Sequence, residues 1–209
     1  MATITGSAVS DTITTTQNST GGPLATSGAD SILGLGGADS LDGGDGNDTI
    51  AGGAGGDSLV GSADTDWLSY AGSTAAVTVN LANATGHAGG DAAGDTISGF
   101  EALLGSGGND SLAGSAGADT IDGGTGNDTI TTGGGADSIL GGDGNDNVTV
   151  FGSGAVTVDG GAGNDIIFGA AANSSLSGGA DDDSIFGIAS VSYTMDGGSG
   201  NDSIGGNGF

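Results

Sequence analysis

A nine-residue repeat constrains this chain more than any other feature. Six segments fit the pattern G-G-x-G-x-D-x-U-x, in which U is a large aliphatic residue: 43–51, 52–60, 123–131, 141–149, 160–168 and 197–205. Degenerate copies occupy 34–42, 105–113 and 114–122. Repeats of this length at a constant phase are typical of solenoids, in which each repeat packs only on its neighbours.

The charge balance shows that the repeats need a cation from outside the chain. The 209 residues include 26 acidic side chains, no lysine, no arginine and 50 glycines, which gives a formal net charge of -26. Self-repulsion opposes a compact state, and ordering so many glycines is costly in entropy. Burying one Ile or Leu returns only about 1.5–3 kcal/mol, so bound metal is expected to supply the missing folding energy.

The same composition excludes several classes of partner and site. Nucleic acid binding requires basic residues, and an anionic membrane surface is disfavoured for the same reason. There is no cysteine, hence no disulfide framework and no thiolate metal site, and no apolar run is long enough for membrane insertion. The segment MATITGSAVSDTITTT lacks the basic and apolar regions of a cleavable secretory signal.

These repeats resemble those of the RTX (repeats-in-toxin, hemolysin-type) calcium-binding family, and the resemblance covers most of the chain. It implies an all-β fold, a right-handed parallel β-roll, or β-helix solenoid. In that family, the first six residues of each nonapeptide form a calcium-binding turn and the last three form a short strand. It also implies export by a Gram-negative bacterium, commonly through type I secretion, with folding on external calcium.

The chemistry of the repeat leads to the same metal. Calcium takes six to eight oxygen ligands in irregular geometry, and glycine turns can direct successive carbonyls at one point. The aspartate at position six adds a carboxylate, and an ion placed between turns 18 residues apart completes its ligands. We therefore predict several Ca²⁺ ions and no other cofactor. The predicted metal ligands are Asp30, Asp39, Asp48, Asp57, Asp66, Asp110, Asp119, Asp128, Asp137, Asp146, Asp165, Asp183 and Asp202.

The aspartate spacing predicts one roll over residues 1–209. It comprises an N-terminal coil (1–24), a first repeat block (25–69), an insertion (70–104) and a second repeat block (105–209). Beyond residue 147 one edge of the second block keeps its aspartates, whereas the other loses the pattern. We therefore expect a nearly continuous ladder of ions on the first edge and few on the second.

The remaining polar and aromatic residues are assigned packing or turn roles. Aspartates at position nine could extend a metal site or serve a solvated turn, and both readings stay open: Asp42, Asp122, Asp159 and Asp196. His87 is expected to be a solvated loop residue, because no converging ligands accompany it. Trp67, Tyr70 and Phe100 are expected to pack where the pattern changes. No catalytic motif is recognisable, so we predict that the chain is not an enzyme.

The leading functional hypothesis is an exported structural protein that assembles through its ends into a filament or surface layer under calcium control. Solenoids normally carry capping repeats, yet neither end of this chain looks capped. Two different complementary ends would form a head-to-tail homopolymer. The alternative is a secreted calcium-binding adhesion or secretion module without enzymatic activity.

Overall fold

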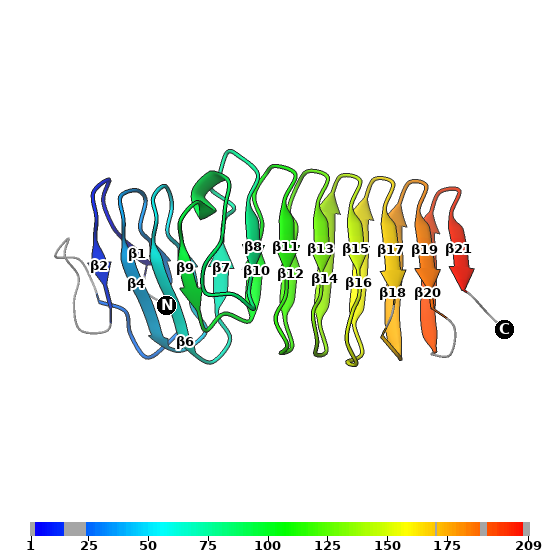
Figure 1. The fold of residues 1–209 in the computed structure, drawn as a ribbon, viewed down its shortest axis with the longest axis horizontal. Helices are drawn as coiled ribbons and strands as arrows, with labels where there is room; N and C mark the ends of the chain where they lie inside the picture. The colour runs from blue at the N-terminus through cyan, green and yellow to red at the C-terminus, as the bar shows by residue number, and fades with distance from the viewer. Residues whose placement is uncertain (1–2, 15–23, 170, 189–191, 207–209) are drawn as a thin grey trace. The chain divides into compact units, whose positions relative to one another are not determined.

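A computed structural model describes residues 3–14, 24–169, 171–188 and 192–206. The chain divides into two compact units, Met1–Ser106 and Gly107–Phe209, and each is described by itself. In both, short strands follow the glycine turns, one to each nonapeptide (Figure 1).

Unit 1 contains two parallel β-sheets. One sheet has the order β1 (Thr3–Thr5), β3 (Ser31–Leu33), β5 (Thr49–Ala51), β7 (Trp67–Ser69), β10 (Ala102–Leu104). The other has the order β2 (Thr12–Ile13), β4 (Ser40–Asp45), β6 (Ser58–Ala63), β9 (Thr96–Ser98). Strand β8 (Thr78–Asn80) and the 3₁₀ turn η1 (Gly90–Ala92) belong to the segment between β7 and β9.

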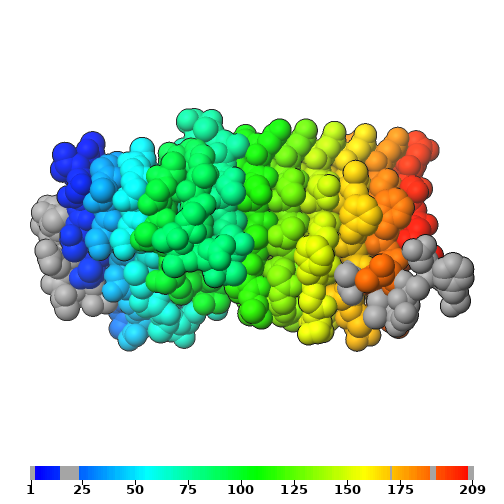
Figure 2. Space-filling view, in the orientation of Figure 1, coloured from blue at the N-terminus to red at the C-terminus, as the bar shows by residue number. Residues whose placement is uncertain are grey.

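Unit 2 repeats the two-sheet arrangement with greater regularity. One sheet has the order β12 (Thr120–Asp122), β14 (Ser138–Asp143), β16 (Thr157–Ala162), β18 (Ser174–Ala180), β20 (Tyr193–Ser199). The other has the order β11 (Ser111–Ala113), β13 (Thr129–Thr131), β15 (Asn147–Thr149), β17 (Ile166–Gly169), β19 (Ser184–Gly187), β21 (Ser203–Gly206). Its coils form parallel ridges in the space-filling view (Figure 2).

Alternation along each strand builds the core. The central aliphatic residue of a strand is buried and its two neighbours are more exposed, as in β13, where Ile130 is buried between Thr129 and Thr131. Because strands pair in register at intervals of one coil, Ile130 stacks on Val148 of the next coil. The core is therefore a thin column of aliphatic side chains between two sheets. The predicted all-β parallel β-roll is confirmed.

The segment predicted as an insertion is partly repeat-like. Strands β9 and β10 lie within residues 70–104, yet they pair in register with β6 and β7. The excursion from the sheets of unit 1 therefore closes by Asp95, and residues 95–104 continue its coils. The N-terminal coil also pairs in register, through β1 and β2. Continuity of a single roll through both units stays a prediction.

The first coil of unit 1 and the last coil of unit 2 differ in how far their aliphatic residues are buried. Ile204, the inward residue of β21, is 49 % exposed, although its register partner Ile185 is fully buried. In unit 1, Ile4 on β1 and Ile13 on β2 are fully buried. Within the described residues the aliphatic core is therefore exposed at β21 and covered at β1 and β2, while the absence of caps at both ends stays a prediction.

Candidate metal centre

The position-six aspartates form columns along the edges of the sheets. In each pair, the backbone N–H of one aspartate donates to Oδ1 of the aspartate one coil later, as in Asp128 to Asp146 at 2.7 Å. The same bond joins Asp30 to Asp48 at 2.8 Å. The columns of unit 1 are Asp30–Asp48–Asp66 and Asp11–Asp39–Asp57. Those of unit 2 are Asp110–Asp128–Asp146–Asp165–Asp183–Asp202 and Asp119–Asp137.

The second carboxylate oxygen of most of these aspartates is buried without a hydrogen-bond partner. This applies to Oδ2 of Asp39, Asp48, Asp57, Asp66, Asp128, Asp137, Asp146, Asp165 and Asp183. Except for Asp137, whose repeat begins with Thr132, the oxygen lies against the first glycine of its own repeat, so a Cβ atom on Gly43 would overlap Oδ2 of Asp48. A buried carboxylate oxygen without a partner is costly unless a cation completes it.

Backbone carbonyls supply further oxygen atoms beside each column. Gly142 and Gly144 have φ of 111° and 134°, a region that favours glycine. A Cβ atom on either would overlap a carbonyl oxygen of the preceding coil, that of Gly124 or Gly126. Stacked turns thus bring carbonyl oxygens close to the turn above them.

This set of donors fits calcium. It consists of oxygen atoms only, which are the ligands that a hard cation of irregular coordination prefers. Among the described residues, no group of three or more His, Cys, Asp and Glu side chains converges, so backbone carbonyls must supply much of any ion's coordination. The aspartates of adjacent coils, together with the turn carbonyls, are the groups that would hold it.

Burial makes these carboxylates unusually basic. It raises the pKa of Asp66 to about 6, and of Asp128 and Asp165 to about 7. The hydrogen bond that each carboxylate accepts from the backbone N–H of the aspartate one coil earlier lowers its pKa. The negative charges of neighbouring acidic residues raise the pKa, in addition to the effect of burial. With no lysine or arginine in the chain, only a proton or an external cation can neutralise them.

We expect acid to replace calcium in part. The pKa values are raised by folding above the ordinary 3.8, so the proton-linked stability is present below about pH 4 and is lost as pH rises through 6 to 7. Metal-free protein should therefore show more β circular dichroism at pH 4.5 than at pH 7.5. Calcium-saturated protein should show little difference. A metal-free chain equally unfolded at both values would contradict the burial of these groups.

The two edges of unit 2 differ as expected from the spacing. One column carries a carboxylate in every coil from Asp110 to Asp202. On the other edge, the register places Val156 beside Asp137 in the following coil, and then Ser174 and Tyr193. The carboxylate column there ends at Asp137, while the uneven distribution of ions remains a prediction.

Three acidic residues outside the predicted ligand set belong to the columns of unit 1: Asp11, which begins one column, and Asp95 and Glu101, which end the two columns. Asp95 accepts the backbone N–H of Asp57 at 2.8 Å, and Glu101 accepts that of Asp66 at 3.2 Å. A signal for Asp95 was available, because residues 95–97 read D-T-I like residues 48–50. Glu101 carries no such signal, since the repeat pattern has aspartate at this place.

Tyr70 supplies a hydroxyl to the last aspartate of one column, as Ser or Thr hydroxyls do for the aspartates that begin three columns, Asp11, Asp30 and Asp119. Its buried hydroxyl donates to Oδ2 of Asp95 at 2.9 Å. A hydroxyl therefore donates to the Oδ2 atom that most position-six aspartates leave without a hydrogen bond.

Phe100 is buried as well, and Trp67 is half-buried, in agreement with the packing role expected for these aromatic residues.

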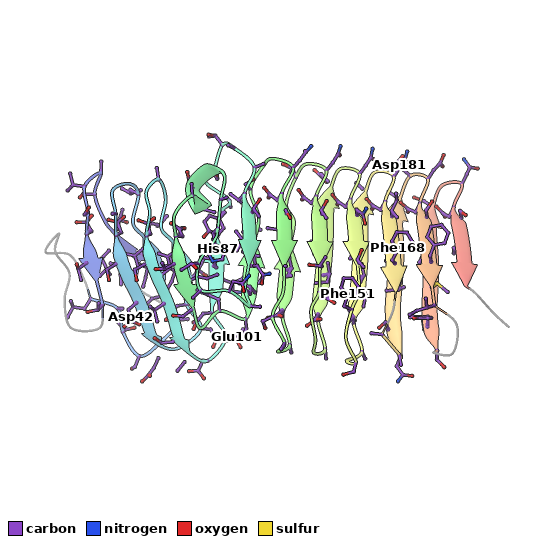
Figure 3. The ribbon with its side chains drawn as sticks, in the orientation of Figure 1. Asp42, His87, Glu101, Phe151, Phe168 and Asp181 are labelled. Carbon is purple, nitrogen blue, oxygen red and sulfur yellow. The ribbon has the colours of Figure 1, made fainter. Side chains whose placement is uncertain are left out.

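The structure corrects the expectation for His87, which is buried. It was expected to be solvated, but it is only 5 % exposed, its Nδ1 accepts the backbone N–H of Asn80, and its Nε2 is buried without a partner. Burial lowers its pKa. The excursion between β7 and β9 folds back on itself through Thr78 and Ala88, which exchange both backbone hydrogen bonds (2.6 and 3.1 Å). Figure 3 shows His87 in this region.

Of the position-nine aspartates, two have a local turn role. Oδ1 of Asp122 accepts the N–H of Gly124, and Oδ1 of Asp196 accepts that of Gly198, each at 3.1 Å. Such bonds two residues along the chain are typical of Asx turns. Asp42 instead accepts the hydroxyl of Ser62 at 2.9 Å, across one coil.

Parallel sheets, glycine turns and columns of buried carboxylates without any cationic side chain define a calcium-binding β-roll. The model of the RTX calcium-binding nonapeptide repeat matches residues 24–59, 42–71, 89–130, 104–139, 114–148, 152–176 and 159–187. The matched segments cover more than half of the chain, which therefore belongs to this family. No curated protein matches it.

Membership establishes calcium, in several ions, as the cofactor. The β-roll of this family is a structural, calcium-binding fold and not typically a catalytic one, and its members are typically secreted by Gram-negative bacteria. In the part of the chain that the structure describes, no helix has the length and hydropathy needed to cross a bilayer.

Proposed function

We propose that this chain is an exported structural protein whose calcium-loaded rolls associate end to end, forming a filament or a surface layer. Calcium binding and the secreted class follow from the family. End-to-end association is our proposal, and the exposed core at β21 carries it.

The coil at β21 offers an incomplete surface. Ile204 is about half exposed where the equivalent residues of earlier coils are buried, and Asp202 is less buried than the aspartates before it. Within the described strands, β21 pairs only with β19, and β20 only with β18. Exposed strand edges and a half-covered core are the surfaces through which solenoids associate.

The first coil of unit 1, with β1 and β2, would contribute backbone hydrogen bonds and calcium ligands to the junction rather than apolar side chains. Within the described strands, β1 pairs with β3 alone and β2 with β4 alone. Because Ile4 and Ile13 are already buried, a head-to-tail junction gains little core there. Strand pairing and a calcium ion shared between Asp202 and the next molecule's first coil would stabilise it. Assembly should therefore need calcium even after each roll has folded.

Ile204→Asp tests the proposal. We expect calcium-saturated wild type to form polymers visible by electron microscopy and sedimentation, and Ile204→Asp to reduce the polymer fraction about tenfold, since a charge would enter the junction. Leu140→Asp is the matched control, because Leu140 is 40 % exposed on β14, which belongs to the other sheet of unit 2 from β21. Asp202→Ala should also slow growth if an ion bridges the junction.

Other outcomes contradict specific parts of the proposal. Compact dimers lost in Ile204→Asp would show that two β21 ends pair with each other. Equal loss of polymer in Leu140→Asp would show lateral association. A wild type that stays monomeric at high concentration in calcium would contradict end-to-end association. The second candidate, a secreted adhesion or secretion module, would then remain; the exposed side chains of Phe151, Phe168 and Phe186 on unit 2 favour it.

A further inference from the structure

Unit 2 carries an exposed apolar groove on the sheet that contains β17 and β19. Phe168 and Phe186 occupy the same outward position in successive coils, and their rings stack with centroids 5.3 Å apart. With Phe151 and Ile188 they form the walls of a depression of about 480 Å³, whose floor is Gly169 and Gly187. We call these six residues the phenylalanine groove.

Four large apolar side chains of the groove face solvent. The exposed fractions are 52 % for Phe151, 44 % for Phe168, 38 % for Phe186 and 52 % for Ile188. Figure 3 shows Phe151 and Phe168 on one face of unit 2. Clustered exposure of this kind on a soluble domain marks an interaction surface, whereas single exposed apolar residues do not.

Packing beneath the groove shapes its floor. The Tyr193 hydroxyl donates to the carbonyl oxygen of Gly169 at 2.8 Å. A Cβ atom on Gly187 would lie 2.9 Å from the Tyr193 ring, and one on Gly169 would lie 2.6 Å from Leu176. Glycine at both positions lets the sheet lie directly on this ring. In the parallel register, Tyr193 occupies the position that Asp137 holds three coils earlier, on the edge of unit 2 whose carboxylate column ends at Asp137.

The groove and its surroundings specify the chemistry of a partner. Thr149 and Val150 also line the groove. Among its described lining residues no side chain is charged and the Thr149 hydroxyl is the one hydrogen-bonding side-chain group, so the lining recognises mainly apolar or aromatic groups. The chain around them has 26 acidic and no basic residues. Asp181 and Asp182 are exposed in the turn that precedes β19, four to five residues before Phe186.

We propose that the phenylalanine groove binds a cationic amphipathic peptide segment, with an apolar side chain in the groove and flanking lysine or arginine beside the acidic turns. Cations also interact favourably with exposed phenylalanine faces. The groove lining holds no carboxylate through which calcium could bridge two copies, so a second acidic chain is repelled there, and an anionic membrane is repelled likewise. A glycan would find too few hydrogen-bonding side chains. The proposal is independent of whether the chain polymerises.

A fluorescence anisotropy titration tests it with calcium-saturated full-length protein. The probe is a labelled hexapeptide with a central Leu-Phe pair and two lysines on each side. Phe168→Thr/Phe186→Thr should weaken binding at least about tenfold, because two central aromatic anchors are removed. Threonine precedes these residues in the same column, at Thr149, so the strand is expected to tolerate it.

Ile166→Ser is the matched control. Ile166 is 40 % exposed and lies two residues from Phe168 on β17, outside the groove, while Asn147 and Ser184 hold its position in the adjacent coils. Binding by this variant should stay within about twofold of wild type. Circular dichroism in calcium should show that all variants are folded.

Two further peptides separate the apolar and charged parts. Replacing Leu-Phe by Ser-Ser should abolish saturable binding, and equal binding would show that charge alone holds the peptide, against the groove. Replacing the lysines by glutamates should weaken binding at least tenfold, and equal binding would overturn the cationic specificity. Equal affinity of wild type and the double Phe variant would overturn the proposal as a whole.

Discussion

Removing calcium at pH 7.5 is expected to unfold both units. The aspartate columns bury carboxylate oxygens without hydrogen bonds, and no lysine or arginine can compensate their charge. Each ion that binds only the folded chain adds about 2.7 kcal/mol of stability at 100 times its dissociation constant, and this chain has many candidate sites. The β circular dichroism should therefore disappear in excess chelator and return on calcium titration.

Two controls separate ion binding from charge screening. Sodium chloride at matched ionic strength should not restore the β signal, because screening does not supply a ligand-bound cation. Magnesium should restore much less than calcium, since it requires near-octahedral geometry and releases water reluctantly. A β signal that persists in protein shown to be metal-free would contradict calcium-coupled folding.

Gly144→Ala is expected to lower the free energy of unfolding by about 2–4 kcal/mol in calcium. Gly144 has a φ of 134°, and a Cβ atom there would overlap the carbonyl oxygen of Gly126 in the preceding coil. The substitution therefore combines backbone strain with a clash against a main-chain oxygen. Thermal unfolding of the calcium-loaded variant, followed by circular dichroism, measures the loss.

Gly117→Ala is the matched control, because Gly117 occupies the same place, the fourth, in its own repeat. Its φ lies outside the left-handed region, and a Cβ atom would meet only Oγ of Ser115, at 3.5 Å. Stability should change by less than about 1 kcal/mol. Equal losses in both variants would show that the repeat position, and not the stacking of carbonyls on glycine, determines the effect.

The repeating parts of this protein could be predicted from its residues alone. The fold, the buried aliphatic column and the burial of aspartates such as Asp128 and Asp146 were predictable, because each nonapeptide encodes one turn and one strand locally. A constant interval of one coil then sets which residues stack. The loss of carboxylates after Asp137 on one edge of unit 2 follows from the same counting.

Where the nine-residue period is interrupted, the arrangement of the residues could be seen only in the folded chain. The burial of His87, the bond from Tyr70 to Asp95 and the place of Glu101 depend on how the excursion folds back, which no local pattern encodes. Likewise, Phe168 and Phe186 fit the repeat at an ordinary outward position. They form a groove because the parallel register stacks them in successive coils. The residues that share a surface are distant in sequence, so the repeat pattern alone does not show the groove.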